Sequence, residues 1–131
     1  MDWKECLGNR IIKPVKEDKN LIRSTRAIAK IKIESAEALP PHLYIGKICL
    51  LYDALREYLE CAALEKGYKI YNHECYVAFL KEVLNLSREG DLFDKLRKIR
   101  NGINYYGLSV TEEEALEVIR ELKELISKFK Q

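Results

Sequence analysis

The stretch Ile48-Cys49-Leu50-Leu51-Tyr52 decides the fold, because it is apolar on every side of a helix. Such a helix has no polar face that could be exposed to solvent, so other elements of the fold have to cover it on all sides. We therefore expect a central, deeply buried helix from about residue 41 to residue 66. Gly67 is expected to end it, since glycine adopts the left-handed conformation at little cost.

The preceding segment, residues 17–39, is predicted to be a helix that ends at Pro40-Pro41, because proline disrupts α geometry. Its apolar and small residues recur at steps of three and four, which predicts one buried face. That face consists of Leu21, Ile28, Ile31, Ser35 and Ala38. The first half of the segment is strongly basic. Such a face is usually just solvated, whereas one that binds RNA adds a salt-dependent contact with phosphate.

Three more helices are predicted after the central one. The first begins at Asn72, a residue type favoured at helix N-caps, and runs to about Leu86. The second runs from Asp91 to about Tyr106, and the third begins at Thr111 in a capping-box pattern. The same periodicity predicts their core faces: Tyr76, Phe79, Leu80, Val83 and Leu84; Leu92, Leu96, Ile99, Ile103 and Tyr106; Ala115, Ile119, Leu122, Ile126 and Phe129.

The whole chain, residues 1–131, has the length of one domain. Hydrophobic residues make up 47% and charged residues 34%, which excludes a disordered chain and a membrane-spanning one. No segment alternates as a strand does. We therefore predict an all-α fold, an antiparallel bundle of about five helices, with residues 1–16 as an irregular N-terminal arm. The first residues lack the apolar core of a secretory signal, so the expected compartment is the cytoplasm.

The four cysteines, Cys6, Cys49, Cys61 and Cys75, match no metal-binding spacing. We expect no metal and no cofactor. The cysteines are expected to be free thiols, three of them packed in the core as small hydrophobic side chains. A disulfide stays open as an alternative, because the cytosol of some hyperthermophiles tolerates such bridges.

The predicted helix 91–106 carries a polar cluster that is unfavourable for a helix. The residues opposite its apolar stripe are Arg97, Arg100, Asn101, Asn104 and, at the margin, Tyr105. Gly102 interrupts the helix at a cost of about 1 kcal/mol relative to alanine. A helix that was only solvated would have better helix formers at these positions, and such local conflicts are often functional.

Two interpretations of the cluster are open. In one, Gly102 lets two helices approach closely, Arg100 pairs with a carboxylate, and the asparagines form hydrogen bonds across an interface. In the other, Arg100 offers its planar guanidinium to a phosphate and Asn101 and Asn104 orient it. Tyr105 or Tyr106 would then stack or donate its hydroxyl.

Two stretches resemble the HEPN domains (higher eukaryotes and prokaryotes nucleotide-binding), particularly small archaeal and bacterial members. One is residues 52–60, YDALREYLE, with Gly67-Tyr68-Lys69 and Asn72-His73-Glu74-Cys75 downstream. The other is residues 96–107, LRKIRNGINYYG. The likeness spans roughly residues 17–130.

The resemblance implies a homodimer in which two copies of the 91–106 helix face each other across a cleft. Many members are metal-independent ribonucleases with Arg-x4–6-His and a polar residue after the arginine. Arg100 and Asn101 match the start of this motif, but the histidine position falls on Tyr105, and tyrosine is a poor base at neutral pH. The candidate catalytic residues are Arg100, Asn101 and Tyr105. The candidate cleft residues are Asn104, Tyr106, Asp53, Arg56 and His73.

The resemblance implies two possible functions for these residues. The first is a HEPN-type dimer that binds RNA or nucleotide at the cleft, with impaired or absent cleavage. The alternative is a non-catalytic partner of a minimal nucleotidyltransferase in a toxin–antitoxin-type pair. His73 is most simply a first-turn polar residue, and whether it reaches Arg100 and replaces the missing histidine stays open. Asp53 and Arg56 are most simply an ion pair.

Overall fold

The fold is built around helix α3 (Tyr44–Glu65), which lies between the other long helices. The structure, a computed structural model, describes residues 1–130. Buried side chains occur all around α3, including Ile48, Leu51, Tyr52 and Leu55, each at most 1% exposed. This confirms the prediction that the apolar stretch forms the central helix.

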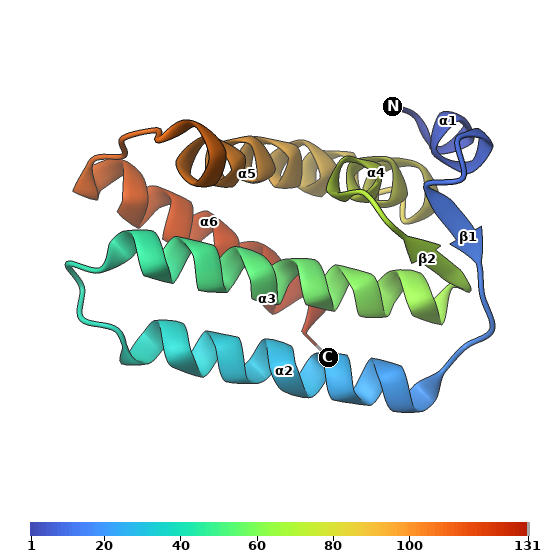
Figure 1. The fold of residues 1–131 in the computed structure, drawn as a ribbon, viewed down its shortest axis with the longest axis horizontal. Coiled ribbons are helices and arrows are strands. Elements are labelled where there is room, and N and C mark those ends of the chain that lie inside the picture. The colour runs from blue at the N-terminus through green and yellow to red at the C-terminus, as the bar shows by residue number, and fades with distance from the viewer. Residues whose placement is uncertain (131) are drawn as a thin grey trace.

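The remaining long helices are α2 (Lys19–Ala38), α5 (Ser87–Tyr106) and α6 (Glu112–Phe129). Helices α2 and α5 run in one direction and α3 and α6 in the other (Figure 1). The most extensive packing joins α3 to α2 and to α6. The predicted all-α class is therefore confirmed. No helix within residues 1–130 combines the length and the apolar character needed to cross a membrane.

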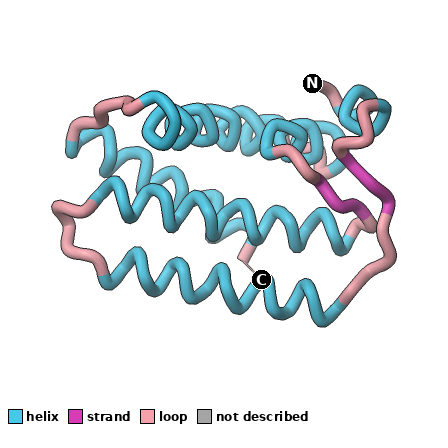
Figure 2. The backbone as a smooth tube through the Cα atoms, viewed as in Figure 1, coloured by secondary structure: helices cyan, strands magenta, loops and turns pink. Residues whose placement is uncertain are grey.

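The N-terminal segment is not irregular, and that prediction was wrong. It forms helix α1 (Trp3–Gly8) and strand β1 (Ile12–Pro14), which pairs antiparallel with strand β2 (Tyr68–Ile70) at one end of the bundle (Figure 2). Ile12 lies opposite Ile70, and both are buried. Strands of three residues are too short to show an alternating pattern, and their pairing partner is distant in sequence.

A disulfide joins α1 to helix α4 (His73–Ala78), so the expectation of four free thiols was also wrong. The bond links Cys6 to Cys75, with their Cα atoms 6.1 Å apart. The free cysteines in the described chain are Cys49, which is half-buried, and Cys61, which is buried. The spacing of cysteines in a sequence does not show which of them meet in the fold.

Helix α2 buries a different face from the one predicted. Leu21, Ile28 and Ile31 are 40%, 48% and 59% exposed, and Ser35 and Ala38 are exposed as well. The buried residues are Ile22, Thr25, Ala29 and Ala36. They recur with helical spacing too, and the small alanines let α2 approach α3 closely. Apolar periodicity alone predicted that the larger side chains would be buried, but the packing of α2 against α3 leaves them exposed to solvent.

Most of the predicted helix ends are confirmed. The Asn72 side chain accepts a hydrogen bond from the backbone N–H of Glu74, Thr111 and Glu114 form the capping box, and Gly67 has a φ of +89°. Helix α4 continues into a π-helical turn, η1 (Phe79–Val83). Helix α5 begins at Ser87, earlier than the predicted Asp91, so that Gly90 lies inside it. A Cβ at Gly90 would meet Lys81 Cγ at 2.6 Å, so this glycine permits a close contact.

Candidate functional site

The side chain of Arg100 reaches from α5 across the face of α3. One guanidinium nitrogen lies 3.5 Å from an oxygen of Asp53, and the guanidinium carbon lies 5.2 Å from the centre of the Tyr52 ring. Its Nε atom is buried and has no hydrogen-bond partner in the described chain. Arg100 is therefore held by one long ion pair and a cation–π contact, with part of its hydrogen-bonding capacity unused.

His73 reaches the same place from the start of α4. Its Nδ1 lies 3.1 Å from the hydroxyl oxygen of Tyr52, whose ring also contacts Arg100. Burial, together with the positive charges of Arg56 and Arg100, lowers the pKa of His73 to about 4. Burial also raises the pKa of Tyr52 to about 12. Both side chains are therefore neutral at neutral pH, and the Tyr52 hydroxyl can donate to the imidazole.

Two more arginines complete this group, which we call the arginine cluster: Tyr52, Asp53, Arg56, His73, Arg97 and Arg100. Arg56 lies 3.4 Å from Glu60, which also binds Lys69 at 2.6 Å. Arg97 contacts Asp94 through two nitrogens, at 2.7 and 3.2 Å. The predicted ion pair between Asp53 and Arg56 is not formed, because each has another partner. Arg100 keeps the longest of these arginine–carboxylate contacts.

The other predicted site residues lie at the end of α5. Asn104 accepts a hydrogen bond from the Cys49 thiol at 3.5 Å, and Asn101 is half-buried without a side-chain hydrogen bond in the described chain. Tyr105 and Tyr106 are 69% and 84% exposed and do not join the cluster. The prediction that Tyr106 belongs to the core face was wrong, because α5 ends there and no element covers it.

Gly102 allows a close approach, as the first interpretation expected, but the neighbour is the following loop. A Cβ at Gly102 would meet Leu108 Cδ2 at 2.9 Å. The backbone N–H groups of Gly107 and Leu108 both donate to the carbonyl of Gly102, and Gly107 has a φ of +64°. Gly102 thus lets the chain fold back over the end of α5.

Tyr52 is the site residue that the sequence reasoning missed. Tyr52 lies in the apolar stretch and begins the HEPN-like stretch 52–60, but it was not predicted as a site residue, although a buried tyrosine hydroxyl needs a hydrogen-bond partner. Tyr52 precedes Asp53 and lies four residues before Arg56, so the three fall along one side of α3. This spacing is the sequence signal that could have added Tyr52 to the predicted site residues Asp53 and Arg56. It gives no information about the residues that α4 and α5 contribute.

Comparisons of this chain with protein-family models, with curated proteins and with solved structures found no match. The resemblance to HEPN domains therefore depends on the sequence motifs alone. Within residues 1–130, no group of three or more histidine, cysteine, aspartate or glutamate side chains is arranged to hold a metal ion. The chemistry available at the cluster is anion binding by arginine and hydrogen bonding by neutral His73 and Tyr52.

We expect His73 to make the protein less stable as the pH falls from about 6.5 towards 4. The pKa of His73 is below its ordinary value of 6.5 in the folded chain, so the unfolded chain binds the proton more readily over that range. Urea unfolding at about pH 7 and about pH 5 measures the effect. His73→Gln should lose less stability between the two pH values than the wild type.

The chain offers a matched control for that experiment. Its only other histidine, His42, is exposed in the connection between α2 and α3. The variant His42→Gln should show the same pH dependence as the wild type. Equal pH dependence of the wild type and His73→Gln would contradict the described burial of the imidazole among arginines.

Proposed function

We propose that this protein is a HEPN-type homodimer that binds RNA or a nucleotide at the α3–α5 face, with Arg100 as the principal phosphate ligand. The observation that carries the proposal is the incomplete pairing of Arg100. Its carboxylate contact is 3.5 Å long, and its buried Nε atom has no partner in the described chain. A buried donor without a partner costs free energy that an incoming acceptor recovers.

A phosphate is the acceptor that suits this arrangement. The guanidinium is planar, permanently charged and able to donate two parallel hydrogen bonds to phosphate oxygens. Arg56 and Arg97 add positive charge nearby, as their effects on the pKa of Tyr52 and His73 indicate. His73 lies beside Tyr52 and near the positive charge of Arg100 and is our candidate for the missing motif histidine if the protein cleaves RNA, acting as a weak base because its pKa of about 4 is well below neutral pH.

The homodimer is proposed from the resemblance, and the exposed end of α5 supports it. Tyr105, Tyr106 and Leu108 are 69%, 84% and 49% exposed and follow the polar cluster closely in the sequence. Burying such side chains against a second copy is favourable, at about 25 cal/mol for each Å² of apolar surface. We place the dimer in the cytoplasm, in one that tolerates the bridge between Cys6 and Cys75.

Arg100→Gln should weaken the binding of single-stranded RNA by about tenfold, which is about 1.4 kcal/mol for a lost charge-assisted contact. The slope of log K against log salt concentration should fall by about 0.7, the value for one phosphate contact. Fluorescence anisotropy with a labelled oligonucleotide measures both quantities. Assaying the same RNA for cleavage by the wild type and by His73→Gln tests His73 as a base.

Arg88→Gln is the matched control, because Arg88 lies on the same helix and its side chain is 70% exposed. It should bind RNA as the wild type does. Equal affinity of the wild type and Arg100→Gln, or no RNA binding by the wild type, would refute Arg100 as the phosphate ligand. A mass near the 15.3 kDa of one chain in light scattering would refute the homodimer.

A second candidate is the non-catalytic partner of a minimal nucleotidyltransferase. The exposed aromatic end of α5 favours it, because large exposed apolar patches mark protein interfaces. In this case RNA binding is absent, and a nucleotidyltransferase co-purifies with the wild type from the native source. Tyr106→Ser should then reduce its recovery.

A further inference from the structure

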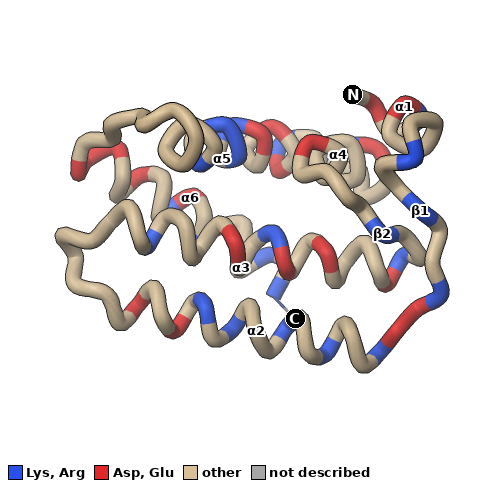
Figure 3. Tube along the Cα trace, viewed as in Figure 1, with Lys and Arg blue, Asp and Glu red and all other residues tan. Residues whose placement is uncertain are grey.

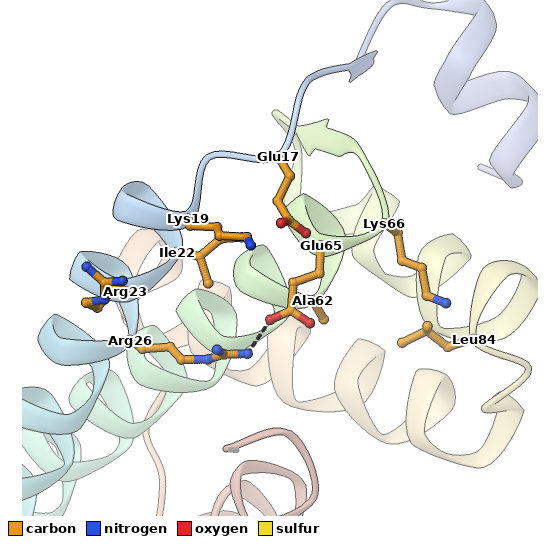
Figure 4. A pocket seen from close by; sticks show the side chains of 9 residues that line it. All are labelled: Glu17, Lys19, Ile22, Arg23, Arg26, Ala62, Glu65, Lys66 and Leu84. Carbon is orange, nitrogen blue, oxygen red and sulfur yellow. Dashed lines mark hydrogen bonds and ion pairs between the residues drawn. The ribbon is translucent and has the colours of Figure 1, made fainter.

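A large hollow opens between α2 and the last turns of α3, on residues that the arginine cluster does not include. Its volume is 740 Å³, and Figure 4 shows the side chains that line it. The apolar residues that line the hollow are Ile22, Ala62 and Leu84. The charged residues that line it are the cations Lys19, Arg23, Arg26 and Lys66 and the acids Glu17 and Glu65. A volume of this size suits a small organic ligand or a nucleotide rather than a single phosphate.

A second hollow of 570 Å³ lies beside α2 and shares Arg23 and Arg26 with the first. It adds the cations Lys30 and Lys130, one acidic residue, Glu34, and the apolar or aromatic residues Ala27, Ile33 and Tyr58. Because both hollows include Arg23 and Arg26, these two arginines form a boundary between them. The boundary is positively charged, and both hollows have apolar walls.

The cations of α2 form a row, which we call the α2 ridge: Lys19, Arg23, Arg26 and Lys30. Their spacing of four, three and four residues keeps them on one side of the helix, over about 16 Å of its axis. Figure 3 shows the basic positions along α2, with acidic ones only towards its C-terminal end. Arg26 pairs with Glu65, but Lys19, Arg23 and Lys30 form no ion pair within residues 1–130.

Apolar side chains are exposed on the same helix. Leu21, Ile28 and Ile31 are 40%, 48% and 59% exposed. A face that served only to be solvated would have polar residues there. Leu21 and Ile28 lie on the side of α2 opposite the ridge, so the apolar surface beside the ridge is that of the two hollows. Cations beside apolar hollows offer both kinds of contact that a single nucleic acid strand makes, since its phosphates are charged and its bases have apolar faces.

We propose that the α2 ridge binds single-stranded nucleic acid, with phosphates on Lys19, Arg23, Arg26 and Lys30 and bases against the apolar walls of the two hollows. A row about 16 Å long engages several consecutive phosphates, which a compact anion cannot do. This surface shares no residue with the arginine cluster. It therefore does not depend on the function proposed for Arg100.

The test neutralises Arg23 and Lys30, two exposed side chains of the ridge without ion pairs. The double variant Arg23→Gln/Lys30→Gln should lower the slope of log K against log salt by about 1.4, and weaken binding roughly 25-fold at about 0.1 M salt. The probe is a labelled oligouridine of about ten nucleotides, followed by fluorescence anisotropy. Leu84→Ser, in the apolar wall of the first hollow, should weaken binding without changing the slope, whereas Leu21→Ser/Ile28→Ser, on the opposite side of α2, should bind like the wild type.

The control is Lys4→Gln/Arg88→Gln, which removes the same formal charge from exposed positions outside α2 and should bind like the wild type. Equal slopes for the ridge variant and the wild type would overturn the proposal. Inorganic polyphosphate is added as a competitor of the labelled oligouridine. If it displaces the probe as well as unlabelled oligouridine does at the same phosphate concentration, the bases contribute nothing to binding and their proposed role is overturned. If Arg100→Gln binds normally while the ridge variant does not, the ridge stands and the function proposed for Arg100 fails.

Discussion

Replacing both Cys6 and Cys75 with alanine is expected to lower the free energy of unfolding by about 4 kcal/mol. The bond closes a loop across 69 residues, and opening it returns that conformational entropy to the unfolded chain. Both side chains are fully buried, so alanine avoids placing a polar group in the core. The loss is a large share of the roughly 5–15 kcal/mol that stabilises an ordinary domain. Urea unfolding followed by circular dichroism measures it.

Reduction provides the matched control for this experiment. Adding a thiol reductant should destabilise the wild type by a similar amount and should leave the double variant unchanged. The exposed segment before β1 should also become more sensitive to protease, because the disulfide holds α1 against α4. A wild type whose unfolding does not respond to complete reduction would contradict the bridge as a stabilising element.

Phe93→Ala is expected to cost about 3–5 kcal/mol, the usual loss for truncating a buried phenylalanine. The Phe93 side chain is fully buried in α5. Its ring stacks on Tyr52 with centres 5.8 Å apart and meets Tyr76 edge-on at 6.4 Å. The truncation therefore leaves a cavity directly behind the ring that contacts Arg100. The free energy of unfolding in urea measures the loss.

Two variants on the same helix calibrate that result. Phe93→Leu keeps part of the volume and should cost about 1–2 kcal/mol. Tyr106→Ala removes an aromatic side chain that is 84% exposed and should change stability by no more than about 0.5 kcal/mol in a monomer. A loss below about 1 kcal/mol for Phe93→Ala would contradict the packing of α5 against α3.

The candidate site was only partly predictable from the sequence. The polar cluster in α5 indicated Arg100, and helix 72–86 was predicted to begin at Asn72, next to His73. Their meeting through Tyr52 depends on α3, α4 and α5 packing together, which no local pattern describes. Tyr105 and Tyr106 follow Arg100 closely in the sequence, yet they point to solvent because α5 ends before another element covers them.

The sequence by itself determined the helical class, the central position of α3, and the caps at Gly67, Asn72 and Thr111, because each depends on residues within a few positions of one another. Only the tertiary structure decided which face α2 buries, that Cys6 bonds to Cys75, and that β1 pairs with β2. Each of those outcomes joins groups far apart in the chain. In α2 two faces had helical spacing, and the small side chains of Ala29 and Ala36 gave the closer packing against α3.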